Sequence, residues 1–328
     1  MTRRVRLRSL AKVNLDLRVL HKRTDGFHEL RTVFQTISLA DTVVIEYEQA
    51  RRTVLDLDDP LAIPDNLVLR AARAVLDTMK IHARVRFRLQ KHIPMGGGLG
   101  GGSSNAAAVL LALPVLAGRQ IPFERLLDLG AELGSDVPFF LTGGTAVAIG
   151  RGTEFYALPD VAAEPILVVE SGIHVATGPA YAALGRSLTS PDLSRRINGF
   201  RLFVRTLGDL RSARAASTLS ANDFESAVFS QRPLLKKMWG RLRKHAAGAR
   251  MTGSGSALFA AFESKAERDL AVKTLEGDGV FKDCRVIPAN LVSGSSYQRL
   301  WRRQLAEHIE RPRTPDELIW PPHSRHAA

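Results

Sequence analysis

The feature of this 328-residue sequence that most restricts its fold is a glycine-rich run at residues 94–105. The run reads P-M-G-G-G-L-G-G-G-S-S-N, with six glycines in seven positions. Because glycine loses more backbone entropy on folding than any other residue, the run predicts a loop rather than a helix interior or a strand. Residues 106–113 follow it, are apolar on every side, and predict a buried helix.

A strand, a glycine-rich turn and a helix in this order form a phosphate-binding unit. Residues 84–89 (R-V-R-F-R-L) alternate between polar and apolar side chains and predict the strand. The N–H groups of such a loop and the positive end of the helix attract an anion, and Ser103 and Ser104 could cap the helix or contact phosphate oxygens. A flexible linker is disfavoured, because it would not run into an apolar helix.

Three other phosphate-binding patterns do not fit the run. No lysine follows the glycines, as a P-loop requires. The pattern G-x-G-x-x-G is present at Gly96, Gly98 and Gly101, but it comes late in the chain and lacks the acidic residue expected about 20 positions later. The H-R-D and D-F-G motifs of protein kinases are absent.

Composition excludes several other classes of protein. The chain is 45% hydrophobic, 24% charged and 6% aromatic, which is close to the globular average. One cysteine, Cys284, excludes a disulfide framework and a multi-cysteine metal site. The N-terminus has no apolar signal region, and the longest apolar stretch, residues 106–117, is shorter than the roughly 20 residues of a membrane span. We therefore expect a cytoplasmic protein with no membrane partner.

The remaining patterns predict an α+β chain with a lobe boundary near residue 158. Further strands are expected at residues 13–19, 36–48, 146–149, 166–169, 257–262 and 285–288. Further helices are expected at residues 66–76, 122–133 and 264–275. Residues 299–328 carry four prolines and scattered charges and predict a loosely ordered tail.

Four sequence blocks, in order along the chain, resemble one family of small-molecule kinases. The glycine-rich run resembles the ATP phosphate-binding loop of the GHMP superfamily, which includes galactokinase, homoserine kinase, mevalonate kinase and phosphomevalonate kinase. Three more blocks narrow the resemblance to the 4-diphosphocytidyl-2-C-methyl-D-erythritol kinase family. These are residues 11–15 (A-K-V-N-L) with 21–30 (H-K-R-T-D-G-F-H-E-L), residues 134–140 (G-S-D-V-P-F-F) and residues 251–256 (M-T-G-S-G-S).

The resemblance implies both a fold and a reaction. The reaction is ATP-dependent phosphorylation of the C2 hydroxyl of 4-diphosphocytidyl-2-C-methyl-D-erythritol to the 2-phosphate, in the non-mevalonate route to isoprenoid precursors. The fold is two-lobed, with an N-terminal ATP-binding lobe of ribosomal-protein-S5-like type at residues 1–158. A C-terminal α/β substrate lobe is expected at residues 159–298, with the active site in the cleft between the lobes.

The catalytic residues are expected on the first strand and after the glycine loop. Lys12, Asn14 and Asp16 alternate along the strand, so they share its polar face and two of them can point into one cleft. The resemblance implies that Lys12 stabilises charge on the transferring phosphoryl group, that Asn14 binds substrate and that Asp136 is the general base. From the residues alone, the strand face could be solvated, and Asp136 could cap the helix that starts near Pro138.

The resemblance carries further binding roles to individual positions. Phe27 and His28 would bind cytosine through a stacking ring and a hydrogen bond, although the family usually has tyrosine at the position of Phe27. Thr177 and Tyr181 would complete the clamp, or Tyr181 could be a core residue. Residues 253–255 would lie near the glycine loop, or form an ordinary turn. The expected ATP-binding residues are Asn66, Pro94, Gly96, Gly97, Gly98, Leu99, Gly100, Gly101, Gly102, Ser103 and Ser104.

ATP is the expected cofactor, and Mg²⁺ is expected to accompany it. No motif indicates the oligomeric state or a protein ligand of Mg²⁺, for which Ser104 is only a candidate. The net charge of +13 comes from 46 basic and 33 acidic residues. It is concentrated in residues 1–12, with five basic residues and no acid, and residues 232–250, with seven basic residues and no acid. A positive field favours anionic ATP and a diphosphate substrate.

Three other functions are weighed against the kinase. A nucleic-acid-binding protein would need aromatic residues among its basic runs, which are missing here, so we expect no nucleic-acid partner. A nicotinamide-dependent oxidoreductase would need the missing ribose-binding acid. Another kinase of the superfamily is the nearest alternative. The turn at residues 26–28 argues against it, because a base-binding pocket has no use in a mevalonate or homoserine kinase.

Overall fold

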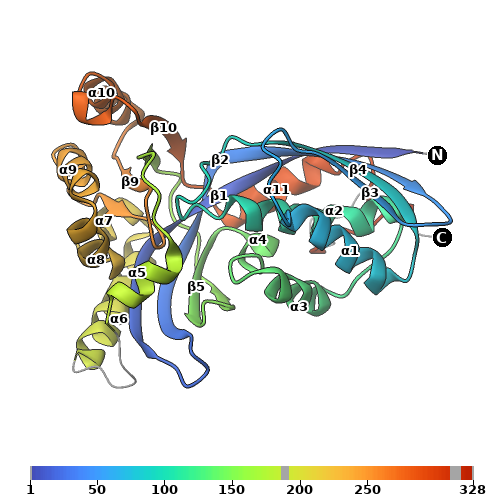
Figure 1. Ribbon diagram of the computed structural model, residues 1–328, viewed down its shortest axis with the longest axis horizontal. Helices are drawn as coiled ribbons and strands as arrows, with labels where there is room; N and C mark the ends of the chain where they lie inside the picture. Colours follow the sequence, from blue (N-terminus) through green and yellow to red (C-terminus); the bar gives the residue numbers. More distant parts are fainter. Residues whose placement is uncertain (1, 186–191, 311–318, 327–328) are drawn as a thin grey trace.

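The computed structural model describes residues 2–185, 192–310 and 319–326 as two lobes that lie side by side (Figure 1). The sheet of the N-terminal lobe has the strand order β3-β4-β2-β5-β6, with β1 paired to the other edge of β2. Its strands are β1 (Arg3–Lys22), β2 (His28–Gln49), β3 (Val54–Asp58), β4 (Ala83–Gln90), β5 (Thr145–Gly150) and β6 (Glu154–Ala157). Mostly antiparallel sheets with separate helices confirm the α+β prediction.

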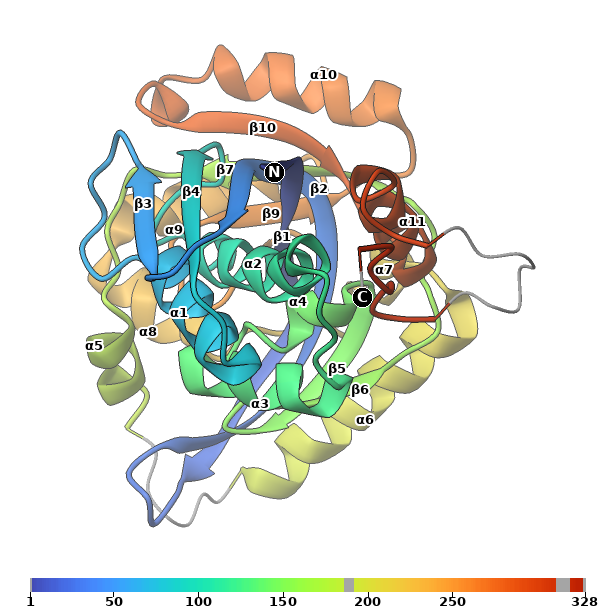
Figure 2. The ribbon, with the colours of Figure 1, turned by 90° about the vertical axis from the view of Figure 1, so that its right-hand side faces the viewer.

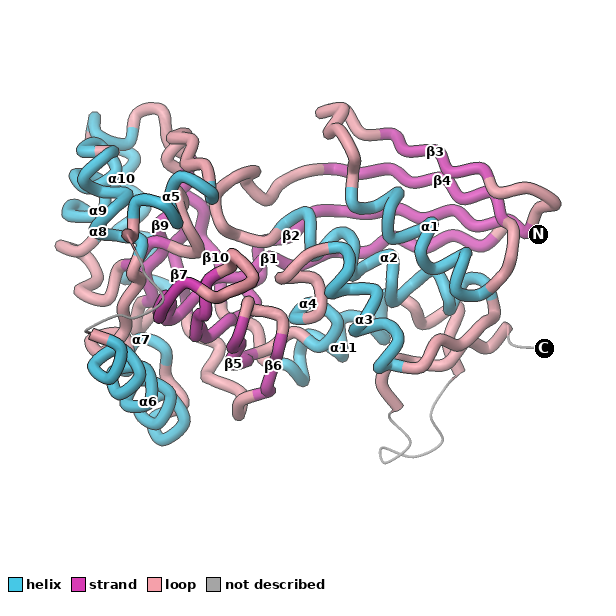
Figure 3. Tube along the Cα trace, turned by 60° about the horizontal axis from the view of Figure 1, so that its bottom comes forward, coloured by secondary structure: helices cyan, strands magenta, loops and turns pink. Residues whose placement is uncertain are grey.

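The strands β1 and β2 are much longer than the patterns at residues 13–19 and 36–48 predict. They form one antiparallel hairpin, whose long strands run side by side in Figure 3 and whose far end lies beside the C-terminal lobe in Figure 1. The prediction that residues 13–19 are half-buried is wrong for residues 13–17, which are buried on both faces. The reason is that Val13 and Leu15 pack with Val168 and Phe200 of the C-terminal lobe, while the polar face lines the site described below.

One face of the first sheet is covered by helices, and α2 is the central one. Figure 2 shows α2 enclosed by the sheet and by its neighbouring helices, and its apolar side chains are buried on all sides, as predicted. Asn66 caps α1 and Pro122 and Gly134 bound α3, as the sequence predicts. The helices of this layer are α1 (Leu67–Met79), α2 (Gly101–Ala117), α3 (Phe123–Leu133), α4 (Phe139–Thr142) and α11 (Gly294–Gln304).

The helix α2 begins at Gly101, five residues before the predicted start at residue 106. Gly101 and Gly102 therefore belong to the first helical turn rather than to the loop. Gly100 adopts a left-handed conformation with φ of 71° and ends the loop. A Cβ atom at Gly100 would lie 2.8 Å from the ring of Phe140, so only glycine fits this junction.

The C-terminal lobe is a four-stranded antiparallel sheet with the order β10-β7-β9-β8. The predicted strands and the helix over residues 264–275 are found within one or two residues of their expected positions. The strands are β7 (Pro165–Glu170), β8 (Arg250–Met251), β9 (Leu258–Ala261) and β10 (Arg285–Asn290). The helices are α5 (Thr177–Ala183), α6 (Leu193–Leu210), α7 (Ala213–Ala216), α8 (Phe224–Gln231), α9 (Pro233–Leu242) and α10 (Lys265–Glu276), with a 3₁₀ turn at Gly279–Phe281.

The prediction of a loosely ordered tail after residue 299 is wrong for the residues described there. Trp301 is 1% exposed and packs in the core of the N-terminal lobe together with Leu305. The indole N–H of Trp320 donates to the carbonyl of Leu141 at 2.8 Å. Fully burying a side chain as large as Trp301 contributes on the order of 2–3 kcal/mol, which composition alone does not reveal. Residues 311–318 and 327–328 lie outside the described residues.

Within the described residues, no helix combines the length and the apolar character that crossing a bilayer requires.

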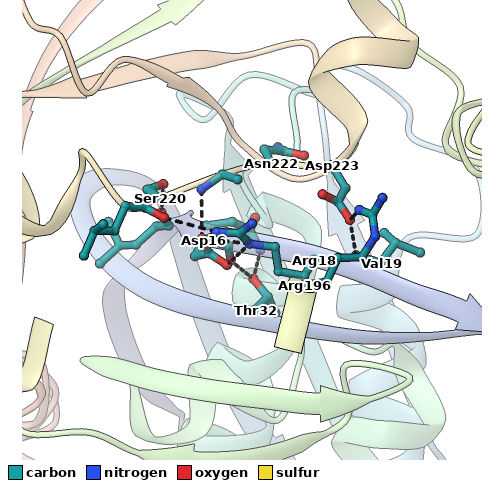
Figure 4. A network of polar contacts seen from close by, with 12 residues as sticks. Asp16, Arg18, Val19, Thr32, Arg196, Ser220, Asn222 and Asp223 are labelled. Atoms are coloured by element: carbon teal, nitrogen blue, oxygen red, sulfur yellow. Dashed lines mark hydrogen bonds and ion pairs between the residues drawn. The ribbon is translucent and has the colours of Figure 1, made fainter. Parts of the chain in front are cut away.

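The two lobes are joined by polar contacts between β1 and residues 220–225, which we call the bridging segment (Figure 4). Ser220 donates its hydroxyl to the carbonyl of Leu15, and the N–H of Ala221 donates to Asp16 at 2.8 Å. Asp16 also pairs with Arg18 at 2.9 Å. Burial raises the pKa of Asp16 to about 6, even though these donors act in the opposite direction. The bridging segment therefore fixes the position of β1 relative to the C-terminal lobe.

Glu225, at the end of the bridging segment, accepts a hydrogen bond from the N–H of Met251 at 2.8 Å. Burial raises its pKa to about 7, against about 4.3 in an unfolded chain. Between these two values the folded state holds the proton that the unfolded state has lost. The contribution of Glu225 to the free energy of unfolding therefore falls as the pH rises.

We expect Glu225→Gln, which keeps the acceptor oxygen, to gain stability relative to the natural chain as the pH rises from 5 to 8. The gain should level off near pH 8, at up to about 3 kcal/mol. Urea denaturation at each pH measures it, and Glu276→Gln on the exposed side of α10 is the matched control. A difference that stays constant from pH 5 to 8 would contradict the expectation.

Candidate active site

A cavity of about 690 Å³ lies between the two lobes and brings together residues from all four sequence blocks. Its walls come from β1, β2, the glycine loop, the start of α4, α5 and the turn after β8. The lining residues are Lys12, Asn14, Leu17, Lys22, Gly26, Phe27, His28, Leu30, Thr32, Phe34, Gly98, Ser135, Asp136, Arg151, Gly152, Thr177, Gly178, Tyr181, Ala182, Phe224, Gly253 and Ser254. Another cavity, of about 460 Å³ between α2, α3 and residues 319–323, contains none of the predicted site residues.

The glycine loop runs along one wall of this cavity and ends at the N-terminus of α2. Gly96, Gly98 and Gly100 all have left-handed φ values of 70–74°. The carbonyl of Leu99 accepts a hydrogen bond from the N–H of Lys12 at 3.0 Å, which ties the loop to β1. The first turn of α2 leaves N–H groups without intrahelical partners, so the loop presents donors and a positive helix end to an anion.

The turn at residues 252–255 packs directly against the glycine loop, so the expected proximity of residues 253–255 to that loop is found. The hydroxyl of Thr252 donates to the carbonyl of Gly98 at 3.3 Å, and the N–H of Ala257 donates to the carbonyl of Gly97 at 3.3 Å. A Cβ atom at Gly98 would lie only 2.4 Å from the carbonyl oxygen of Thr252. The two lobes therefore meet at a point where no side chain fits.

We expect Gly98→Ala to destabilise the protein by about 1–3 kcal/mol and to lower ATP affinity, because the new methyl group must push the loop and the turn apart. The left-handed backbone at Gly98 adds to the strain. Thermal denaturation and calorimetric ATP titration measure the two effects.

Gly102→Ala is the matched control for stability. Its Cβ would make an ordinary 3.7 Å contact with Leu67, within the first turn of α2. Equal melting temperatures for the two variants would contradict the expected effect of Gly98→Ala.

The other predicted ATP-binding residues in and after the loop differ in their exposure to solvent. Pro94 and Leu99 are buried beneath the loop. Ser104 is also buried, its hydroxyl donates to the carbonyl of Leu10 at 2.7 Å, and its N–H donates to Gly100. These bonds use both donors of Ser104, so neither is left for a phosphate oxygen. The hydroxyl oxygen still has a lone pair, so a contact of Ser104 with Mg²⁺ stays a prediction. Ser103 lies in the first turn of α2 and is partly exposed.

Asn66 is a helix cap in the structure. Its side-chain oxygen accepts from the N–H of Val68 at 3.0 Å, and its amide donates to Asp59 at 3.0 Å. Asn66 does not line the cavity, but the next residue, Leu67, lies within van der Waals reach of a Cβ placed at Gly102. The N-termini of α1 and α2 are therefore neighbours, and a role for Asn66 in nucleotide binding stays a prediction.

Lys12, Asn14 and Asp136 form a compact polar cluster beside the glycine loop. The ammonium of Lys12 lies 3.4 Å from a carboxylate oxygen of Asp136 and donates to the side-chain oxygen of Asn14 at 2.7 Å. Lys12 is 3% exposed and lies 4.7 Å from the ring centre of Phe34. Burial lowers the pKa of Lys12, while the neighbouring Asp136 acts in the opposite direction. The side chain of Asp136 is 31% exposed and faces the cavity.

Asp16 does not join this cluster, although strict alternation would put it on the same face. The register of β1 against β2 shifts between Leu10 and Lys12 and again between Asn14 and Asp16. The second irregularity turns Asp16 away from the cavity and toward Arg18 and the bridging segment, as Figure 4 shows. Two of the three polar residues therefore share the cleft.

The predicted clamp residues line the other end of the cavity. His28 and Tyr181 stack on each other with ring centres 4.8 Å apart, and Tyr181 packs edge-on against Phe224. Phe27 is 51% exposed and carries the guanidinium of Arg151 over its ring at 3.6 Å. The hydroxyls of Thr177 and Ser254 are 3.1 Å apart. Burial raises the pKa of Tyr181 to about 12, so its hydroxyl stays protonated at neutral pH.

Sequence reasoning missed several polar residues of the site. Thr32 accepts a hydrogen bond from the amide of Asn14 at 2.8 Å, and the hydroxyl of Thr252 accepts from the N–H of Asn14 at 3.0 Å. Thr252 belongs to the M-T-G-S-G-S block, so the motif contained a signal for it. Arg151 and Thr32 lie outside the motif blocks, and only the folded chain brings them to the cavity.

Metal-ligating side chains do not cluster in the described part of the chain. No group of three His, Cys, Asp or Glu residues there could hold a metal ion. Near the phosphate loop, the carboxylate of Asp136 is paired with Lys12. The described residues therefore do not form a dedicated cage for Mg²⁺, an ion that proteins commonly bind through one or two carboxylates and the phosphates of a nucleotide.

Comparison with known proteins places the chain in a family. Residues 66–144 match the GHMP kinases N terminal domain, and residues 200–278 match the GHMP kinases C terminal family. A 4-diphosphocytidyl-2-C-methyl-D-erythritol kinase of Solibacter usitatus (strain Ellin6076) is 50% identical over 99% of this chain and 98% of its own length. The enzyme of the same name from Gloeobacter violaceus is 36% identical over 84% of this chain and 91% of its own length.

Solved structures give the same assignment. A crystal structure of 4-(cytidine 5'-diphospho)-2C-methyl-D-erythritol kinase has a TM-score of 0.72 and 34% identity, covering 87% of this chain and 98% of the other. A homoserine kinase from Cytophaga hutchinsonii shares the fold, with a TM-score of 0.68 at 19% identity over 89% of this chain and 96% of the other. The resemblance predicted from four sequence blocks is confirmed. The chain belongs to the 4-diphosphocytidyl-2-C-methyl-D-erythritol kinase family of GHMP kinases.

Proposed function

We propose that this protein transfers the γ-phosphoryl group of ATP to the C2 hydroxyl of 4-diphosphocytidyl-2-C-methyl-D-erythritol. The observation that carries the proposal is the Lys12–Asp136 pair, 3.4 Å apart, which lies between a phosphate-type glycine loop and an aromatic pocket. The product is the 2-phosphate, an intermediate of the non-mevalonate route to isoprenoid precursors. The family assignment supports this substrate.

The polar cluster supplies what phosphoryl transfer needs. Asp136 accepts the proton of the C2 hydroxyl as its oxygen forms a bond to the γ-phosphorus, and the bond from that phosphorus to the departing ADP breaks. The ammonium of Lys12 lies where negative charge develops on the phosphoryl oxygens and stabilises it in a site largely removed from water. Asn14 accepts a hydrogen bond from the same ammonium and is assigned to the positioning of the substrate.

The glycine loop and the N-terminus of α2 are assigned to the phosphates of ATP. Their backbone donors and the helix dipole favour a polyanion at this position. Mg²⁺ is assigned to the nucleotide, which brings its own phosphate ligands, and the ion would neutralise part of the charge on those phosphates. A cytoplasmic location belongs to the same proposal, because ATP is the donor and the single cysteine, Cys284, forms no disulfide.

The aromatic end of the cavity is assigned to the cytosine of the substrate. Phe27, His28 and Tyr181 offer stacking surfaces and a hydrogen-bonding ring within one pocket. Lys22 and Arg151 line the same end and suit an anionic diphosphate. A mevalonate or homoserine substrate has no base to stack on these rings, which favours the cytidyl substrate over those of other GHMP kinases.

The decisive experiment measures ADP production with ATP and three acceptors: 4-diphosphocytidyl-2-C-methyl-D-erythritol, mevalonate and homoserine. We expect turnover of the first alone. Turnover of mevalonate or homoserine, with none of the cytidyl compound, would reject the proposed substrate and leave a GHMP kinase of different specificity.

We expect Phe27→Ala to raise KM for the cytidyl substrate by about 10-fold or more with a smaller change in kcat, because stacking on a base contributes about 1–3 kcal/mol. The exposed ring makes few core contacts, so the fold should tolerate the change. Phe27→Tyr, which restores the residue common in the family, is the matched control and should keep a low KM. An unchanged KM in the alanine variant would count against stacking on this ring.

A further inference from the structure

Asn222 lies in the bridging segment, is 6% exposed and has a partner for each of its polar groups. Its amide nitrogen donates two hydrogen bonds, to the carbonyl of Met251 at 2.7 Å and to the carbonyl of Gly253 at 2.8 Å. Its side-chain oxygen accepts from the N–H of Phe224 at 2.9 Å. Asn222 does not line the cavity, so it would not touch a substrate bound there.

The two carbonyls that Asn222 holds belong to the segment that completes the active site. Gly253 donates its N–H to the side-chain oxygen of Asn14 at 2.9 Å, and Thr252 contacts both Asn14 and the carbonyl of Gly98. The same oxygen of Asn14 accepts from the ammonium of Lys12. A shift of the turn at residues 252–255 would therefore move Asn14 and release one side of Lys12.

Asn222 is also fixed to the strand that carries the catalytic lysine. The backbone of Leu17 is hydrogen-bonded to the residues on both sides of Asn222. Its N–H donates to the carbonyl of Ala221 at 2.8 Å, and its carbonyl accepts from the N–H of Asp223 at 3.0 Å. Asp223 accepts from the N–H of Val19 at 2.9 Å and pairs with Arg196, and these contacts are drawn in Figure 4. Residues 221–223 thus join the two lobes. Their backbone contacts bind β1, and the side chain of Asn222 binds the segment that contains the turn of the other lobe.

We propose that Asn222 is a positioning residue for phosphoryl transfer, which sets the turn at residues 252–255 against Asn14 and the glycine loop. The inference rests on the proposed function for the reaction it affects. Its physical basis is that reacting groups must be held within a fraction of an ångström of the productive geometry, so that a displacement of about 1 Å can lower a rate by about 100-fold. The amide is the group required, because two carbonyls converge on one nitrogen and only a donor satisfies both.

The test compares Asn222→Asp with Ser220→Ala. Asn222→Asp keeps the size of the side chain and its acceptor for Phe224 but places an oxygen against two carbonyls. Ser220→Ala removes one buried hydrogen bond from the same segment, to Leu15, without touching the turn.

For Asn222→Asp we expect kcat to fall about 10- to 100-fold and ATP affinity to weaken. The KM for the cytidyl substrate should change less than about 3-fold, since aspartate keeps the acceptor for Phe224 and the rings of Phe27, His28 and Tyr181 come from other elements. For Ser220→Ala we expect a lower melting temperature and a kcat within about twofold of the natural chain.

A second variant covers the case in which Asn222→Asp does not fold. Asn222→Ser keeps one donor, and we expect its kcat to lie between those of the natural chain and Asn222→Asp. If Asn222→Asp does not fold, we expect the kcat of Asn222→Ser to be at least about 5-fold below that of the natural chain. If the natural chain turns over the substrate and the Asn222 variants have an unchanged kcat, the positioning role is overturned. Equal losses of kcat in Ser220→Ala and the Asn222 variants would overturn it too, because the effect would then be general to the segment. No turnover by the natural chain would instead reject the proposed function.

Discussion

Asp136→Asn should lower kcat by about 100- to 10,000-fold while leaving the melting temperature and the affinity for ATP close to those of the natural chain. The amide keeps the shape of the side chain but cannot accept the proton of the substrate hydroxyl. The Asp136 side chain is about one-third exposed, and the amide oxygen of asparagine can still accept a hydrogen bond from Lys12, which also keeps its bond to Asn14. Steady-state kinetics with the cytidyl substrate, with thermal denaturation alongside, measure both quantities.

The matched control for this prediction is Asp128→Asn. Asp128 is an exposed carboxylate of α3, eight positions before Asp136. It forms a surface ion pair with Arg125 at 3.9 Å, which contributes little to stability. A kcat for Asp136→Asn within about threefold of the control would remove Asp136 from the mechanism.

Lys12→Met should lower kcat by about 100- to 1,000-fold, since it removes the ammonium that neutralises charge in the transition state. Methionine matches the apolar length of lysine, so the packing beside Phe34 is largely kept. The exposed Lys237→Met in α9 is the control for loss of a charge. Unchanged kcat in Lys12→Met would show that charge stabilisation comes from elsewhere.

The double variant Lys12→Met with Asp136→Asn sharpens both predictions. The two groups are 3.4 Å apart and act on the same proton and phosphoryl transfer, so their effects should not add. We expect the double variant to be at most about 10-fold slower than the slower single variant. Losses that multiply fully would indicate that the two side chains act in independent steps.

Local features of this molecule were predictable from sequence because their causes lie within a few residues. Asn66 caps α1, Pro122 and Gly134 bound α3, and the glycine run precedes a helix that is buried on all sides. Each of these depends on backbone propensity and hydrogen bonding inside one segment. The expected proximity of Lys12 and Asp136 is also found, since their charged groups lie 3.4 Å apart.

The position of Asp16 was not predictable, because it depends on how β1 pairs with β2. A one-residue shift in register turns a side chain to the opposite face, and the sequence of β1 does not reveal where such shifts occur. The contact between Gly98 and Thr252 joins residues far apart in the chain and requires both lobes to be folded. The role proposed for Asn222 follows from the same kind of long-range contact and no motif would suggest it.

Composition does not reveal the packing of the last part of the chain, for a different reason. Prolines and charges after residue 299 suggested disorder, but Tyr297, Trp301 and Leu305 supply apolar side chains at helical spacing. Two of them are among the most deeply buried large side chains of the molecule. A few large apolar residues can outweigh a polar average, because the free energy of burial depends on the area removed from water.

The burial of α11 against the first lobe has a consequence for how the chain acquires its structure during synthesis. The core of the N-terminal lobe contains Trp301 and Leu305, so a ribosome must make nearly the whole chain before that core can close. The C-terminal lobe, from β7 to β10, lies between the two halves of this core in sequence and can fold first. Until α11 arrives, the apolar surfaces of β1 and α4 that it covers are open to water and to other unfinished chains, a condition that favours aggregation and engagement by chaperones.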